Sequence, residues 1–227
     1  MNVSVKLEVC SECQYHCTHC AHQGLRAFDP HYHLSMADLE SFIKATEESD
    51  YIADLYMHGP GEPLIWRHLT EGLARLRASK AINSIVINSN GLLLPRVAHI
   101  LDFVDQIRIS TYPSVKIETI IHPKIIYNPH PVFIKKQYPA SVPCICLCNG
   151  PMLYRDLIFP YCGPPLFDAV LNANSSKNPL SFGTKLGRHY ADDLINKSGT
   201  FPECSYCWSN SNCDYVYEAH STTLSED

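Results

Sequence analysis

The sequence has few basic residues and no long apolar run, and both shortages exclude whole classes of function. Lysine and arginine together number 18 among 227 residues, the net charge is −5, and the cations are scattered along the chain. Nucleic-acid binding needs clustered cations, so this composition argues against a nucleic-acid partner. No apolar stretch approaches the roughly 20 residues that span a bilayer, and the N-terminus lacks the apolar run of a signal peptide. We expect a cytoplasmic protein without a membrane partner.

Cysteine is missing from the middle of the chain. The 11 cysteines form two groups, with none between Cys20 and Cys144. A disulfide scaffold spreads its cysteines through a small secreted chain, whereas clustered thiols in a reducing compartment indicate metal or redox chemistry. The distribution therefore predicts two metal centres, one for each group.

Strand and helix patterns alternate over the first 110 residues. Strands are expected at 3–9, 51–57, 84–88 and 106–110, and helices at 35–48, 64–79 and 95–104. Such alternation predicts parallel strands joined by right-handed crossovers. Beyond residue 113, prolines leave room only for short strands at 124–127 and 132–135, a hairpin at 152–159, and helices at 166–172 and 188–196. The polar tail from residue 218 is expected to be frayed.

The first cysteine group allows two interpretations. Cys10, Cys13, Cys17 and Cys20 make two CxxC pairs, but only three residues separate the pairs. The paired knuckles of a zinc ribbon stand about 15–20 residues apart, so a single four-cysteine zinc loop is the weaker alternative. The stronger interpretation is CxxxCxxC, from Cys13 to Cys20. Three thiolates on one loop can hold three irons of a [4Fe–4S] cluster and leave the fourth iron open to a ligand.

These residues resemble the signature of the radical S-adenosylmethionine (SAM) enzymes, CxxxCxφC, with His19 at the aromatic position φ. The resemblance implies that Cys13, Cys17 and Cys20 bind a [4Fe–4S] cluster whose open iron chelates SAM. One electron, from a flavodoxin- or ferredoxin-type donor, then cleaves SAM to methionine and a 5′-deoxyadenosyl radical that abstracts hydrogen from a substrate. Cys10 lies outside the signature.

Three further segments follow in the order that this family shows. The GPGEP turn after the second strand resembles the family's GGE-like loop, Asn88–Gly91 resembles its TNG segment, and Ser110 ends the fourth strand. Each alone could be an ordinary turn. Together they end strands at the edge where β/α barrels carry their chemistry. The resemblance covers about residues 3–115, and it implies a SAM site made by His19, Gly59, Gly61, Glu62, Asn88, Asn90 and Ser110.

The second cysteine group resembles the SPASM or twitch extension of radical SAM enzymes. Cys204, Cys207 and Cys213 have the spacing CxxCx₅C, and Cys162 precedes them. The further cysteines of a full SPASM domain are missing, which implies the shorter, one-cluster twitch version. Its ligands would be Cys162, Cys204, Cys207 and one of three alternating positions, assigned to Cys148 but equally open to Cys144 or Cys146. A structural zinc site is the alternative.

The predicted fold is α/β, an open partial β/α barrel of about four to six strands over residues 1–140. A small cysteine-rich, twitch-like subdomain would occupy 141–217, and the polar tail 218–227. A closed eight-stranded barrel does not fit, because such barrels typically need about 200–250 residues for themselves.

The resemblance implies hydrogen abstraction from a small polar substrate, with net dehydrogenation and an auxiliary cluster that takes the electron. Short radical SAM–twitch enzymes include an aminocyclitol dehydrogenase. The alternatives are an epimerase or isomerase, with Cys10 or Cys213 as hydrogen donor, and an enzyme that modifies a short peptide. A non-catalytic zinc or iron–sulfur protein is the competing class, and it has no use for the open-iron triplet or the GPGEP loop. Acid–base candidates are His16, His19, His22, His31, His33 and Tyr112, and Arg108 and Arg155, like Glu62, are candidates for binding charges of the substrate or SAM.

Overall fold

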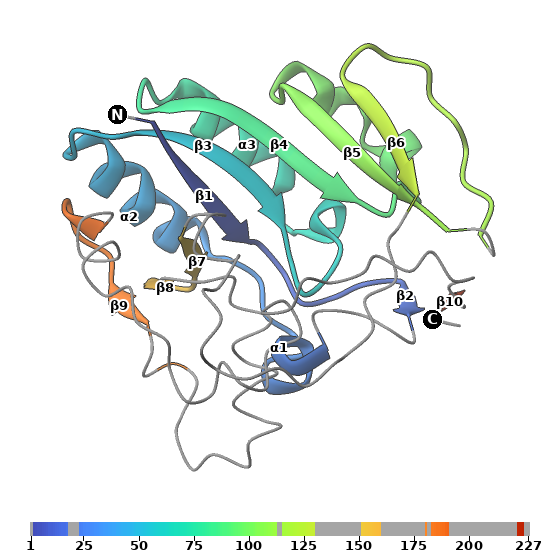
Figure 1. Ribbon diagram of the computed structural model, residues 1–227, viewed down its shortest axis with the longest axis horizontal. Helices are drawn as coiled ribbons and strands as arrows, with labels where there is room; N and C mark the ends of the chain where they lie inside the picture. Colours follow the sequence, from blue (N-terminus) through green and yellow to red (C-terminus); the bar gives the residue numbers. More distant parts are fainter. Residues whose placement is uncertain are drawn as a thin grey trace, which may run out of the picture.

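One eight-stranded sheet organises the structure (Figure 1). The computed structural model of the chain describes residues 2–17, 23–112, 115–129, 151–159, 180, 183–190 and 222–224. The strand order is β6-β5-β4-β3-β1-β7-β8-β9. The strands of this sheet are β1 (Asn2–Glu8), β3 (Ile52–His58), β4 (Ile82–Ser89), β5 (Gln106–Thr111), β6 (Ile125–Pro129), β7 (Met152–Tyr154), β8 (Leu157–Phe159) and β9 (Thr184–Lys185).

The strands from β6 to β7 all run parallel, and β8 and β9 continue the sheet antiparallel. β6 and β9 end the strand order, so the sheet is open rather than closed into a barrel. This confirms the predicted open α/β architecture and its parallel pairing. The hairpin expected at 152–159 forms, and its first strand pairs with β1. That pairing attaches it to the core sheet, although the sequence assigns it to the C-terminal subdomain.

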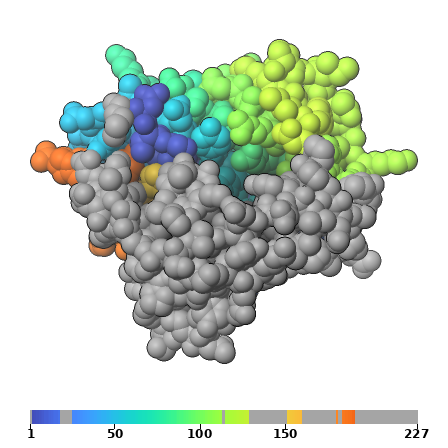
Figure 2. All heavy atoms as spheres, viewed as in Figure 1, coloured from blue at the N-terminus to red at the C-terminus, as the bar shows by residue number. Residues whose placement is uncertain are grey.

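α2 (Met36–Glu47) and α3 (Leu69–Ala78) cover one face of this sheet (Figure 1). α2 begins at the predicted position, where the Ser35 side chain accepts a hydrogen bond from the Asp38 amide. α3 follows the short 3₁₀ helix η1 (Pro63–Ile65). Apolar side chains of both helices join those of the strands in one core, which includes Val5, Leu7, Leu39, Phe42, Leu55, Met57, Leu73, Leu76, Ile85, Ile87 and Ile107. In the space-filling view, the coloured residues of the sheet, from blue through green to yellow, adjoin one another along the upper part of the molecule (Figure 2).

Several elements differ from the prediction. The expected helix at 95–104 is two 3₁₀ helices, η2 (Leu94–Arg96) and η3 (Ala98–Asp102). The expected helix at 64–79 starts later, because η1 and a turn come first. A short helix, α1 (Gln23–Phe28), has no counterpart in the prediction. The strand at 132–135, the helix at 166–172 and all but the first residues of the helix at 188–196 lie outside the described residues.

The sequence predicts a frayed tail, but part of the tail forms a strand. Its residues Thr222–Leu224 form β10, which pairs antiparallel with β2 (Tyr15–Cys17) in a separate two-stranded sheet. The tail backbone therefore lies beside the first cysteine group. Among the described residues, no helix is both long and apolar enough to cross a membrane.

Gly72 in α3 is required by the packing of Trp66, and this gives a first prediction. A Cβ atom at Gly72 would lie 2.1 Å from the Trp66 ring. That ring is buried, and its Nε1 donates to the Leu34 carbonyl at 2.8 Å, so it has little freedom to move. Gly72→Ala should lower the unfolding free energy by about 1–3 kcal/mol through overpacking, exceeding the roughly 1 kcal/mol that alanine adds to a helix.

Gly187→Ala is the matched control for denaturant unfolding, because a Cβ atom there meets nothing within 4 Å. It should change stability by no more than about 0.5 kcal/mol. Equal effects from the two substitutions would contradict the packing argument.

Candidate functional site

The segments that the sequence predicts to be functional meet at one edge of the sheet. Parallel strands end at a common edge, so the chain segments that follow β1, β3, β4 and β5 lie near one another (Figure 1). In chain order, these segments carry the cysteine loop (residues 10–20, described as far as residue 17), the GPGEP turn, Asn90–Gly91 and Tyr112. Such an edge is where open α/β sheets bind their ligands.

The GPGEP turn is bonded directly to the start of the cysteine loop. The Gly61 amide donates to the Cys10 carbonyl at 3.0 Å, and the Glu62 amide donates to the Glu12 carbonyl at 2.7 Å. A Cβ atom at Gly61 would lie 2.1 Å from that Glu12 carbonyl, and one at Gly59 would lie 2.9 Å from the Cys10 carbonyl. Both glycines therefore permit a backbone-to-backbone approach, a need that the sequence does not reveal.

Glu62 joins the ends of β3 and β4. Its buried carboxylate accepts from the Leu64 amide at 3.0 Å and the Ser89 hydroxyl at 2.7 Å through Oε1, and from the Asn90 amide at 2.7 Å through Oε2. Burial raises the pKa of Glu62, while the hydrogen bonds from Asn90, Ser89 and Leu64 act in the opposite direction. The carboxylate is engaged inside the protein on both of its oxygens.

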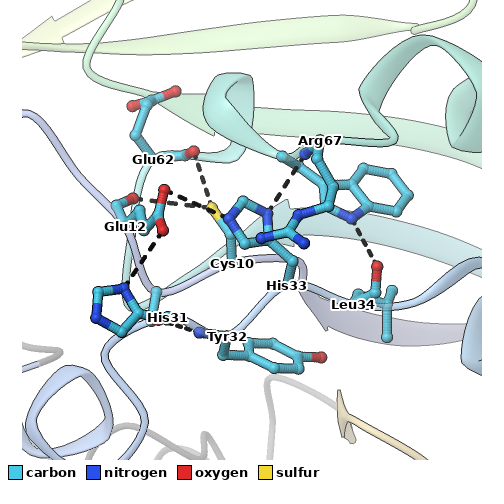
Figure 3. Close-up of polar contacts among 10 residues, drawn as sticks. Cys10, Glu12, His31, Tyr32, His33, Leu34, Glu62 and Arg67 are labelled. Atoms are coloured by element: carbon cyan, nitrogen blue, oxygen red, sulfur yellow. Dashed lines mark hydrogen bonds and ion pairs between the residues drawn. The ribbon is translucent and has the colours of Figure 1, made fainter.

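Cys10 is a packed thiol at the end of β1 (Figure 3). It is fully buried, and its Sγ lies 3.1 Å from the Glu62 carbonyl, to which it donates. Burial, followed by the charge of Glu62, raises the pKa of this thiol far above its ordinary value. The S–H group is buried and donates to a backbone carbonyl, and this placement disfavours Cys10 as a hydrogen donor to a substrate. The other candidate donor, Cys213, lies outside the described residues.

Cys13 and Cys17 lie on the cysteine loop beyond Cys10. The Tyr15 amide donates to Cys13 Sγ at 3.4 Å, and Asn90 Nδ2 lies 3.8 Å from the same sulfur. Burial raises the pKa of the Cys13 thiol to about 11. His19, Cys20 and all cysteines of the second group lie outside the described residues. Within the described ranges, no group of three His, Cys, Asp or Glu side chains is placed to bind a metal ion.

The cysteine loop nevertheless fits an anionic group such as a thiolate-bound iron–sulfur cluster. Two polar atoms on it, Gln14 Nε2 and Tyr15 Oη, are buried and have no hydrogen-bond partner among the described residues. Both atoms can donate, and both belong to residues that lie between Cys13 and Cys17 in the sequence. Buried donors without acceptors are rare in folded proteins and indicate an ion or ligand that accepts from them when it is bound.

A row of polar side chains crosses the sheet close to the same edge. Glu8 of β1 pairs in register with His58 of β3, and Asn88 of β4 pairs in register with Arg108 of β5. Since Met57 pairs with Ile87, the next residues, His58 and Asn88, are at the same level. These four side chains alternate with the buried apolar residues of their strands, so they lie on the face opposite the helical layer.

Glu8 and His58 form a carboxylate–imidazole pair within this row, which is an ion pair only when the imidazole is protonated. His58 Nδ1 lies 3.5 Å from Glu8 Oε1; the Glu8 side chain is fully buried and the His58 side chain is 17% exposed. Neither residue belongs to a motif, so the sequence alone did not predict them as functional. The available signal was a polar residue at each strand end on the alternation that opposes the core, the face that also carries Asn88 and Ser110.

Among the other candidate residues, His31, His33 and Arg155 have partners outside this row. His31 and His33 lie 3.6 Å and 3.4 Å from the Glu12 carboxylate, and burial foremost lowers the pKa of His33 (Figure 3). Arg155 forms an ion pair with Asp29, and its φ of 56° is in the left-handed region at the β7–β8 turn. His16 is exposed, and His22 lies outside the described residues.

Comparison with known proteins identifies the fold. No protein-family model and no curated protein matches the sequence. The structure of BtrN in complex with AdoMet (SAM) and 2-DOIA matches over 95% of this chain and 94% of that chain, with a TM-score of 0.63 and 14% sequence identity. The chain has the fold of BtrN. An open conformation of selenomethionine BtrN matches with a TM-score of 0.61 and 15% identity, over 97% of this chain and 95% of that one.

Glu62→Gln should test whether the Glu62 carboxylate holds the BtrN-like edge together. In one orientation the glutamine NH₂ group would face the Asn90 amide, and in the other it would face the Leu64 amide and the Ser89 hydroxyl, so at least one donor loses its acceptor. We expect the unfolding free energy to fall by about 1–3 kcal/mol in denaturant titrations.

Glu40→Gln is the control, because Glu40 forms a surface ion pair with Arg75. Its loss should cost about 0–1 kcal/mol. Unchanged stability of Glu62→Gln, with weaker SAM binding, would instead indicate that Glu62 serves the ligand rather than the fold.

Proposed function

We propose that this protein is a radical SAM enzyme that cleaves SAM reductively and oxidises a small polar substrate. The observation that carries the proposal is the position of residues 13–17, the described part of the CxxxCxxC segment. It follows β1 at the carboxyl edge of an open parallel sheet, in a fold shared with a protein crystallised with AdoMet. A carrier of electrons or zinc would not need the GPGEP turn and Asn90 to be hydrogen-bonded to residues 10–14 beside these cysteines.

The proposed ligands of the [4Fe–4S] cluster are Cys13, Cys17 and Cys20. When bound, the cluster and SAM supply a 5′-deoxyadenosyl radical that removes a hydrogen atom from the substrate. Asn88, Asn90 and Ser110 stand on or beside the polar row and are the proposed SAM contacts, together with His19 and the backbone of Gly59 and Gly61. Glu62 contributes by holding the GPGEP turn against β4.

The polar row supports a net oxidation. Converting an alcohol to a ketone removes one hydrogen atom from carbon, one proton from oxygen and one electron. In its neutral form, the His58 imidazole, whose Nδ1 lies 3.5 Å from the buried Glu8 carboxylate, is a suitable acceptor for the proton and becomes an imidazolium paired with Glu8. When bound, an auxiliary cluster supplies the electron acceptor; its proposed ligands are Cys148, Cys162, Cys204 and Cys207. A flavodoxin- or ferredoxin-type protein is the proposed source of the electron that starts the reaction.

A small polar substrate agrees with the ligand of the BtrN structure, which holds 2-DOIA. The side chains of the polar row are hydrogen-bonding and charged, as recognition of such a molecule requires. The burial of Cys10 argues against its use as the hydrogen donor of an epimerase.

Cysteine variants test the first part of the proposal. After anaerobic reconstitution with iron and sulfide, replacing Cys13, Cys17 or Cys20 by alanine should abolish 5′-deoxyadenosine formation under reduction, because each removes one cluster ligand. Cys10→Ala should retain it, since Cys10 is a packing residue. Chromatographic detection of 5′-deoxyadenosine is the measurement. An essential Cys10 together with a dispensable Cys13 would overturn the assignment.

A histidine variant tests the oxidation. With 2-DOIA as the probe, His58→Gln should slow ketone formation by about 10²–10⁴-fold through loss of the proton acceptor. Formation of 5′-deoxyadenosine should persist. His68→Gln is the matched control, because His68 pairs with Glu71 at the start of α3, away from the polar row. Unchanged ketone formation in His58→Gln would remove His58 from the reaction.

A further inference from the structure

Gln14 and Tyr15, between the first two cysteines of the signature, carry buried polar atoms that nothing in the described part of the chain satisfies. The atoms are Gln14 Nε2 and Tyr15 Oη. The Tyr15 side chain is 1% exposed, and its ring meets the Tyr112 ring edge-on at 5.3 Å between centroids. Water therefore does not satisfy the hydroxyl, and a ring held by packing cannot turn the hydroxyl toward solvent.

The orientation of the Gln14 amide follows from its neighbours. Asn90 Oδ1 accepts from the Leu92 amide at 3.0 Å, so Asn90 Nδ2 is the end that faces the cysteine loop. This Nδ2 donates to Gln14 Oε1 at 3.3 Å. Gln14 Oε1 is therefore the accepting end of its amide, and both hydrogens on Nε2 remain to be donated.

The Tyr15 hydroxyl also has a proton to donate. A phenol, with an ordinary pKa of about 10, is protonated at neutral pH, and no described group accepts from Tyr15 Oη. The Cys13 and Cys17 thiols become thiolates when they bind iron, so the surroundings of this donor become more negative in the loaded protein.

We propose that Gln14 Nε2 and Tyr15 Oη donate hydrogen bonds to sulfur atoms of the iron–sulfur cluster on the cysteine loop and thereby raise its reduction potential. The proposal rests on the proposed function, since it requires that cluster. Reduction adds negative charge to the cluster, and a hydrogen-bond donor stabilises the more negative state. Both residues are positioning residues for the cluster and take no part in the chemistry of the substrate.

Redox titration of the reconstituted enzyme, without SAM and followed by electron paramagnetic resonance, tests the proposal. Tyr15→Phe and Gln14→Leu should each move the midpoint potential of the SAM cluster to more negative values at unchanged iron content, and the double variant should move it further. Tyr127→Phe is the control. It also removes a phenol hydroxyl, but that hydroxyl bonds to the Ile120 backbone beside β6. An unchanged potential in both Tyr15→Phe and Gln14→Leu overturns the proposal.

SAM offers another anionic acceptor, its carboxylate, and a second measurement distinguishes the two. The dissociation constant of SAM is measured for the same variants. Weaker SAM binding at an unchanged cluster potential would assign the donors to SAM and overturn the cluster assignment. A lower melting temperature of metal-free Tyr15→Phe at an unchanged potential would make the hydroxyl structural, and this too would overturn the cluster assignment.

Failure of the proposed function has its own signature. A wild-type protein that assembles no [4Fe–4S] cluster, or forms no 5′-deoxyadenosine, overturns the proposed function, and absence of the cluster overturns this proposal as well. A wild-type protein that is active, and whose cluster potential does not respond to either substitution, overturns this proposal alone.

Discussion

The backbone contact between the GPGEP turn and residues 10–12 is the constraint on which the site depends. Two amide hydrogen bonds, from Gly61 and Glu62, fix the start of the cysteine loop on the end of β3. The Glu62 carboxylate then extends this connection to β4 through Ser89 and Asn90. Three strand ends thus act as one rigid support. A loop that must place several thiols for one cluster needs such support, because ordering a free loop would cost about 1–2 kcal/mol per residue in backbone entropy.

The two faces of the sheet divide stability from chemistry. One face is apolar and packs on α2 and α3, and the alternate residues on the other face are polar near the carboxyl edge. The buried Glu8 carboxylate is tolerated there because His58 lies 3.5 Å away. A carboxylate in a packed apolar core would cost several kcal/mol without such a partner. Its position at a strand end, on the face opposite the helices, indicates that Glu8 contributes to the site rather than to the stability of the fold.

The sequence predicted the parallel pairing of the strands, the α2 cap and the convergence of motifs, because these depend on local patterns. Apolar patterns define β1, β3, β4 and β5, and Ser35 with Asp38 defines the start of α2. The roles of Gly59, Gly61 and Glu62 could not be predicted, since they depend on contacts with residues about 50 positions earlier or 27 positions later. The Glu8–His58 pair was hidden for the same reason: register between strands is a tertiary property.

Satisfaction of hydrogen bonds separates residues that support this edge from residues that serve a ligand. Glu62 belongs to the family-like motif, yet both oxygens of its carboxylate already accept hydrogen bonds from groups of the chain itself. Gln14 and Tyr15 belong to the variable positions of the signature, yet their donors lack partners in the described structure. A motif records which residues the fold and the ligand need together, and it does not distinguish the two needs. A buried donor that lacks an acceptor does distinguish them, because leaving such a donor unpaired costs free energy unless a bound group accepts its hydrogen bond.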